Sequence, residues 1–194
     1  KYSTTVNSCS DGLYIALKAI NLKQKDEVIV TSYSWISTAS SILQCNAVPV
    51  FCDVGKGTSN IDFRKVEKLI NKKTRAIIFV NLYGNLCDMD RLLEIGEKYN
   101  IHVVEDSAEA IGSIYKGQPC GSMGIFSTFS FHGTKTITSG EGGMFVTNSE
   151  DLYNKVLTSK KDYQKEMNSF FSQNQKLTPR NCICVGEKTK ELLK

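Results

Sequence analysis

The sequence predicts an α/β fold in which a mostly parallel sheet is flanked by helices. Short apolar segments rich in β-branched residues recur along the chain, and segments with apolar residues at helical spacing lie between them. Such alternation makes successive strands parallel and puts helices on both faces of the sheet. The chain has 194 residues, of which 41% are hydrophobic and 23% charged, so a globular domain with a real core is expected rather than a disordered or fibrous chain.

The expected elements follow one another in order along the chain. The expected strands are residues 27–31, 48–53, 76–80, 101–105, 125–131 and 143–147. The expected helices are residues 11–20, 35–45, 62–70 and 89–99. The first helix shows the helical spacing clearly, in Leu13, Ala16, Leu17 and Ile20.

Charge and cysteine content limit the functional classes. The net charge of +4 comes from lysines near the C-terminus, which is typical of a solvated face, and the aromatic-basic interleaving of a nucleic-acid surface is missing elsewhere. No apolar run approaches the roughly 20 residues that span a bilayer, and no signal-peptide pattern occurs. Seven scattered cysteines indicate reduced thiols. We therefore expect a cytoplasmic protein without nucleic-acid or membrane partners.

No metal site is expected. The closest cysteine pair, Cys182 and Cys184, is too tightly spaced for a zinc site and has no second pair of ligands.

Lys135 lies in a loop that follows an apolar strand, among hydroxyl side chains and before three glycines. A lysine becomes a nucleophile when its surroundings favour the neutral amine, and glycines let a backbone approach a ligand closely. Lys135 is therefore a candidate for imine formation with an aldehyde. A solvated lysine in a turn before a glycine-rich hairpin is the alternative.

Polar residues follow several expected strands, and ligands of parallel sheets bind at the carboxyl ends of strands. Trp35 follows the first expected strand, Asp106 follows the fourth, and Ser130 and Lys135 belong to the end of the fifth. Residues 7–12 precede a helix, whose N-terminus favours an anion such as phosphate. An aromatic plate, a carboxylate, a lysine and a phosphate cradle are the parts that bind pyridoxal phosphate.

Each part has an ordinary structural alternative. Asp106 could cap a helix, and Trp35, as the single tryptophan, could belong to the core. Ser10 or Asp11 could simply cap the first helix. His132, beside the lysine loop, could be a structural residue rather than a substrate or cofactor contact.

Four segments resemble the DegT/StrS-type nucleotide-sugar aminotransferases, most closely the perosamine-synthase type of 4-aminotransferase. The segments are residues 129–135 with 140–143, 105–112 with 115–117, 32–39, and 49–54. The likeness runs in order from about residue 5 to about residue 158. It implies a pyridoxal-phosphate enzyme of the aspartate-aminotransferase fold type, active as a homodimer. Its reaction would transfer an amino group from glutamate to a nucleotide-linked keto-sugar, for surface polysaccharide of the lipopolysaccharide O-antigen type.

The resemblance also implies roles for individual residues. Lys135 would bind the cofactor aldehyde and act as the acid-base catalyst. Asp106 would bind the pyridinium nitrogen, Glu109 would lie near the ring hydroxyl, and Trp35 would stack on the ring.

The phosphate would be bound by Ser10 and Ser130, and His132 would contact the substrate. The chain has Cys9 and Ser10 where the family usually has Gly-Thr, so a side chain replaces the usual close backbone approach in the phosphate loop.

The resemblance divides the chain into two parts. Residues 1–160 would form the cofactor-binding large domain without the family's N-terminal lead-in, and residues 161–194 a divergent, basic segment with the small domain absent or truncated. Because Lys1 stands where an initiator methionine is expected, a fragment is anticipated. A catalytically incompetent remnant that acts as a binding or interaction module is the alternative to an enzyme.

Overall fold

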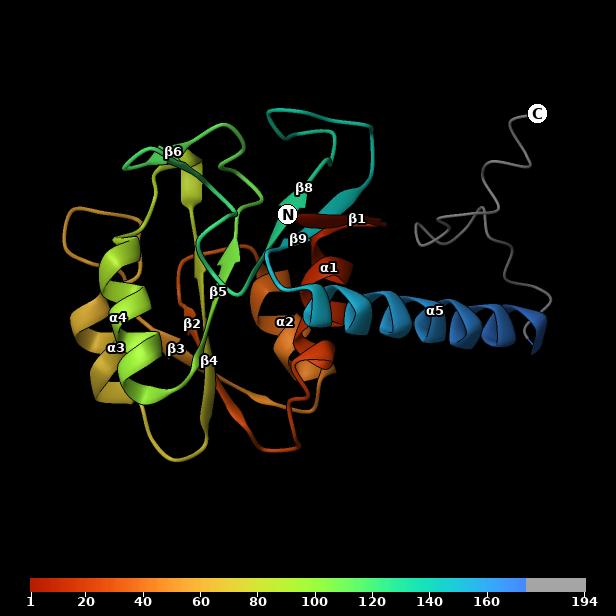
Figure 1. Cartoon of the computed structure of the whole chain (residues 1–194), viewed down its shortest axis with the longest axis horizontal. Helices are drawn as coiled ribbons and strands as arrows, with labels where there is room; N and C mark the ends of the chain where they lie inside the picture. Colours follow the sequence, from red (N-terminus) through yellow and green to blue (C-terminus); the bar gives the residue numbers. More distant parts are fainter. Residues whose placement is uncertain (174–194) are drawn as a thin grey trace.

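A computed structural model describes residues 1–173 as one seven-stranded sheet with helices on both faces, together with a small hairpin (Figure 1). The strands of the large sheet are β1 (Tyr2–Val6), β2 (Glu27–Thr31), β3 (Val48–Cys52), β4 (Thr74–Val80), β5 (His102–Asp106), β8 (Phe126–Ser130) and β9 (Gly143–Thr147). The helices are α1 (Cys9–Ala19), α2 (Ile36–Gln44), α3 (Phe63–Leu69), α4 (Met89–Tyr99) and α5 (Glu150–Gln173), with a 3₁₀ turn at Leu82–Gly84. The hairpin consists of β6 (Ile114–Tyr115) and β7 (Gln118–Pro119).

The sheet order is β1-β9-β8-β5-β4-β2-β3. The five strands from β8 to β3 are parallel, whereas β9 and β1 are antiparallel to their neighbours. This confirms the predicted mostly parallel α/β sheet. All five parallel strands end at one edge, so the residues that follow β2, β4, β5 and β8 lie along the same side of the molecule.

Helices cover the sheet on both faces, with α1, α2 and α5 on one and α3 and α4 on the other (Figure 1). Alternate residues of β2 enter the two cores: Val28 and Val30 contribute to the first, and Ile29 to the second. All three side chains are fully buried. A strand buried on both faces reads as a continuous apolar run, which is why β2 could be recognised in the sequence.

Helix ends follow local capping. The Ser8 side chain accepts a hydrogen bond from the Asp11 backbone N–H at 3.1 Å and so caps α1. The alternative in which Ser10 or Asp11 caps this helix is therefore wrong, since both lie in its first turn. Asp88 caps α4, and Asn100 ends it in a left-handed conformation at φ 51°.

Helix α5 continues to Gln173, past residue 160, where the sequence places the end of the large domain. Leu152 and Val156 attach its first part to the core beside α1. The domain boundary stays a prediction. Residues 174–194, which include Cys182 and Cys184, lie outside the described residues. Within the described part, no helix is long and apolar enough to cross a membrane.

Candidate active site

A cavity of about 490 Å³ opens at the carboxyl ends of the parallel strands. All the site residues predicted from the sequence line this cavity: Cys9, Ser10, Trp35, Asp106, Glu109, Ser130, His132 and Lys135. The fold therefore brings together residues that are up to 126 positions apart (9 to 135) in the chain.

Lys135 lies in the connection between β8 and β9. Its backbone N–H donates to the His132 carbonyl at 2.9 Å, and the connection is closed by the Phe131 N–H donating to the Gly142 carbonyl at 2.9 Å. The Lys135 ammonium donates to Glu109 Oε1 at 2.8 Å, and its side chain is 22% exposed. A freely solvated turn lysine is therefore the wrong interpretation.

Glu109 links this lysine to the turn after β4. Its second oxygen accepts the backbone N–H of Tyr83 at 3.1 Å, and Tyr83 adopts a left-handed conformation at φ 56°. Burial raises the pKa of the Glu109 carboxyl, but the hydrogen bonds from Lys135 and Tyr83 and the charge of Lys135 outweigh it, so the pKa is lowered. Glu109 is therefore ionised and paired at neutral pH.

Asp106 ends β5 and is 4% exposed. Its Oδ2 accepts the Thr38 hydroxyl at 2.9 Å, and its Oδ1 accepts the Ala108 backbone N–H at 3.2 Å. Burial raises the pKa of Asp106 although these hydrogen bonds oppose the shift. A turn follows Asp106 rather than a helix, so the helix-cap alternative is wrong.

Trp35 immediately precedes α2 and is 76% exposed, so its assignment to the core is wrong. Thr38, which sequence reasoning missed, lies in the first turn of α2 and is 1% exposed. Its hydroxyl is 3.0 Å from the Ser34 hydroxyl. Ser34 precedes α2, so this contact joins the loop after β2 to the first turn of the helix, and no local sequence pattern singles out Thr38.

The N-terminus of α1 forms another wall of the cavity, where Cys9 and Ser10 lie. The backbone of β9 passes very close by, since a Cβ added at Gly143 would lie 2.6 Å from the Ser8 carbonyl carbon and 2.7 Å from the Cys9 nitrogen. Glycine is therefore required at this position. Unpaired N–H groups at a helix N-terminus favour an anion.

His132 and Ser130 lie on the side of the cavity formed by β8. The His132 backbone N–H donates to Ser130 Oγ at 3.4 Å. The His132 ring has Nδ1 3.1 Å from the Thr134 hydroxyl and Nε2 3.5 Å from Glu141 Oε1. The substrate contact expected of His132 stays a prediction.

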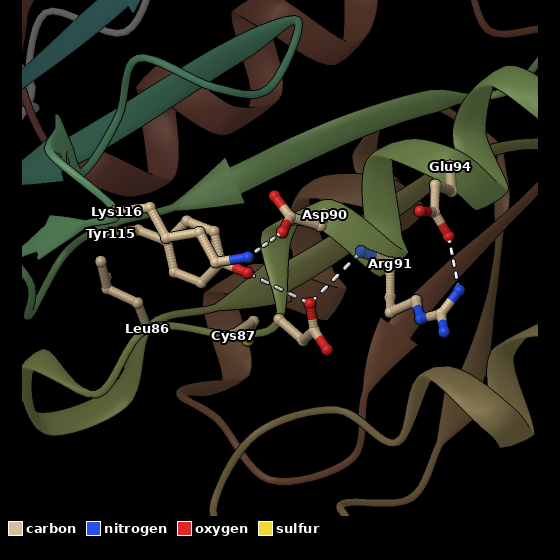
Figure 2. Close-up of a pocket in the computed structure, with 8 residues that line it drawn as sticks. Leu86, Cys87, Asp90, Arg91, Glu94, Tyr115 and Lys116 are labelled. Carbon is tan, nitrogen blue, oxygen red and sulfur yellow. Dashed lines mark hydrogen bonds and ion pairs between the residues drawn. The ribbon is translucent and has the colours of Figure 1, made fainter.

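A second hollow, of about 670 Å³, lies between the start of α4 and the β6–β7 hairpin (Figure 2). Its charged groups pair with one another: Lys116 with Asp90, and Arg91 with Glu94 at 2.7 Å. The Tyr115 hydroxyl donates to Asp88 at 3.2 Å. The contacts of Lys116 and Tyr115 attach the hairpin to the start of α4. Since the polar groups of this hollow are engaged with one another, the cavity around Lys135 is the better candidate for chemistry.

The comparisons with known proteins agree with this geometry. A model of the DegT/DnrJ/EryC1/StrS aminotransferase family matches residues 1–190. The chain belongs to this family.

Two relatives and one solved structure illustrate the likeness. The chain is 46% identical over 156 residues to a GDP-perosamine synthase of Caulobacter vibrioides, covering 80% of this chain and 42% of that protein. It is 40% identical to the spore coat polysaccharide biosynthesis protein SpsC of Bacillus subtilis, and the match covers 80% of this chain and 40% of SpsC. The structure of an aminotransferase from Psychrobacter cryohalolentis superimposes with a TM-score of 0.79 at 39% identity. The match covers 81% of this chain and 40% of that aminotransferase.

Membership of the DegT/DnrJ/EryC1/StrS family confirms the resemblance drawn from the lysine, carboxylate and tryptophan segments, and the structural match confirms the fold class. The chain spans about two fifths of the length of these relatives. No group of three or more His, Cys, Asp or Glu side chains able to hold a metal ion occurs in the described part of the chain.

Proposed function

We propose that this chain is the cofactor-binding part of a pyridoxal-phosphate enzyme that transfers an amino group from glutamate to a nucleotide-linked keto-sugar. The observation that carries the proposal is the arrangement around one cavity of Lys135, Asp106, Trp35 and the N-terminus of α1. The names of the perosamine-synthase and SpsC relatives support a sugar substrate and a role in polysaccharide biosynthesis. The proposal further assigns the chain to a cytoplasmic homodimer that makes surface polysaccharide of the O-antigen type.

The residues present fit this cofactor. Asp106 is a buried carboxylate in the cavity wall, where an ionised group is costly unless it acquires a cationic partner, and a protonated ring nitrogen is such a partner. Trp35 keeps an exposed aromatic face at the cavity. The absence of a side chain on Gly143 lets the start of α1 lie against β9 at the cavity, and the N–H groups at a helix start favour a phosphate.

When bound, pyridoxal phosphate supplies an aldehyde and an electron-withdrawing ring that stabilises a carbanion next to nitrogen. Asp106 holds the proton on the ring nitrogen, and Trp35 covers one face of the ring. Ser10, Ser130 and the N–H groups of α1 bind the phosphate.

Lys135 has two tasks in this proposal. Its Nζ would hold the cofactor at the aldehyde carbon, and once freed from that carbon it would accept and return a proton as the acid-base catalyst. Glu109, 2.8 Å from Nζ, holds the lysine beside the ring.

The experiment records the absorption spectrum of the purified chain with pyridoxal phosphate before and after borohydride reduction. We expect a band that reduction converts into a stable bond to Lys135, located by peptide mass spectrometry. Lys135→Ala should abolish this band, whereas Lys116→Ala, whose lysine pairs with Asp90 in the other hollow, should retain it. The assignment fails if Lys135→Ala keeps the wild-type band.

A second measurement adds glutamate and follows conversion to the pyridoxamine form. Conversion supports the amino-transfer proposal. Binding without conversion supports the alternative of a catalytically incompetent binding or interaction module.

A further inference from the structure

Cys9, the first residue of α1, points toward the carboxylate at the end of β5. Its Sγ lies 3.6 Å from Asp106 Oδ1 and 3.2 Å from Thr128 Oγ1, and the residue is 9% exposed. We infer that Cys9 is a positioning residue for Asp106, whose thiol holds Oδ1 and keeps the carboxylate oriented toward the ring nitrogen of the cofactor. The role toward the cofactor rests on the proposed function.

The Cys9 thiol donates its proton to the Asp106 carboxylate rather than to the Thr128 hydroxyl. A thiol carries one proton, and an ionised carboxylate is a stronger acceptor than a hydroxyl, while the Thr128 hydroxyl has a proton of its own to direct at sulfur. Burial and the negative charge of Asp106 raise the pKa of Cys9 well above its usual range. Cys9 therefore stays a neutral donor at every pH at which the enzyme would work.

Three donors from different parts of the chain then fix one carboxylate. Cys9 of α1 and the Ala108 backbone N–H face Oδ1, and the Thr38 hydroxyl of α2 faces Oδ2 at 2.9 Å. Donors to the ionised form oppose the rise in the pKa of Asp106 that burial causes. The two helices that begin at the cavity thus determine both the rotation and the charge of Asp106.

This role differs from that of a side chain that merely fills space. A filling residue would affect stability alone, whereas a donor to Asp106 affects the proton affinity of that carboxyl. Cys45 is the matched control, because it is a half-buried thiol whose Sγ lies 3.7 Å from the Tyr14 carbonyl and which does not line the cavity.

The experiment titrates Asp106 in the full cofactor-free chain by ¹³C NMR of labelled aspartate carboxyls, with Asp106→Asn assigning the signal. We expect Cys9→Ala to move the titration midpoint of Asp106 to higher pH, as Thr38→Val should, and Cys9→Ser to restore it. Cys45→Ala should leave it unchanged. If Cys9→Ala does not fold, Cys9→Gly is used in its place, because it removes the same hydrogen-bond donor.

A parallel titration with pyridoxal phosphate measures the affinity of wild type and of each variant for this cofactor. Because a thiol is a weak donor, loss of its hydrogen bond in Cys9→Ala should weaken binding of pyridoxal phosphate by about three- to tenfold. The inference is overturned if the Asp106 midpoint is the same in Cys9→Ala as in wild type. If wild type does not bind pyridoxal phosphate, the proposed function fails, and the carboxyl titration still decides whether Cys9 controls Asp106.

Discussion

Lys135 and Glu109 form a 2.8 Å ion pair in the wall of the cavity, and the other oxygen of Glu109 accepts the backbone N–H of Tyr83. The pair holds the lysine side chain beside the position proposed for the cofactor. An ammonium ion has no lone pair for attack on an aldehyde, so Lys135 must lose a proton before it can react. Glu109 therefore orients the lysine and also delays its reaction.

The first prediction concerns this delay. Glu109→Gln removes the negative charge that stabilises the ammonium form. Because both side chains are about a quarter exposed, the effect is moderated by solvent, and we expect the bond between Lys135 and pyridoxal phosphate to form about three- to tenfold faster at pH 7. Stopped-flow absorbance measures the rate.

Glu94→Gln is the control, because Glu94 pairs with Arg91 in the other hollow (Figure 2). It should leave the rate unchanged. A slower rate in Glu109→Gln than in wild type would show that the orienting role of the carboxylate outweighs its charge.

The second prediction concerns Asp106, whose buried carboxyl has a raised pKa. A carboxyl whose pKa is higher in the folded than in the unfolded state makes folding less favourable once the pH exceeds the unfolded value, which is about 4 for aspartate. The penalty is complete above the folded pKa and disappears as the pH falls below about 4. Asp106→Asn should therefore raise the Tm of the cofactor-free chain at pH 7 by a few degrees.

The same substitution should weaken pyridoxal phosphate binding, because the amide cannot compensate a protonated ring nitrogen. Thermal melts of wild type and Asp106→Asn between pH 4 and pH 8 test the predicted effect on Tm. The gain in Tm should shrink toward the acidic end, and a gain that is independent of pH would contradict the electrostatic explanation.

Much of this architecture could be predicted from sequence because its signals are local. The apolar run of β2 indicates a strand buried on both faces, and the position of Asp106 after β5 follows from the rule that ligands bind at the carboxyl ends of parallel strands. Strand β1 could not be predicted, since its sequence is largely polar and only Val6 is buried. It forms because β9 supplies an antiparallel partner along its whole length.

The contacts inside the site were harder to predict from the sequence. Glu109 and Lys135 are 26 residues apart, and their ion pair depends on the folded path of the connection after β8. The left-handed backbone of Tyr83 is uncommon for a residue that is not glycine, asparagine or aspartate, and a side-chain acceptor distant in the sequence holds its N–H. No local pattern encodes such a contact.

The third prediction concerns the close approach of β9 to α1. Gly143→Ala would place a methyl group 2.6 Å from the Ser8 carbonyl carbon, and backbone atoms cannot yield as a flexible side chain can. We expect a loss of about 1–3 kcal/mol in stability, together with weaker phosphate binding. Chemical denaturation and pyridoxal phosphate titration measure the two effects.

Gly133→Ala, in the connection that precedes β9, is the control, since the nearest atom to its new methyl group is the Gly140 carbonyl oxygen at 3.8 Å. It should change stability by no more than about 0.5 kcal/mol. Equal losses in the two variants would mean that any glycine-to-alanine change between β8 and β9 is destabilising, and the approach of β9 to α1 would not be the cause.

The last prediction uses Trp35, the single tryptophan of the chain. Its side chain is 76% exposed at the cavity, so its emission in the cofactor-free chain should resemble that of a solvated indole. Pyridoxal phosphate bound against the ring should quench this emission, with the same concentration dependence as the absorbance band assigned to Lys135. In Lys135→Ala, quenching should persist at higher cofactor concentration, because stacking and phosphate contacts do not need the covalent bond. If the absorbance band forms while the emission of Trp35 stays unchanged, the tryptophan does not cover the ring, and its exposed face serves another contact.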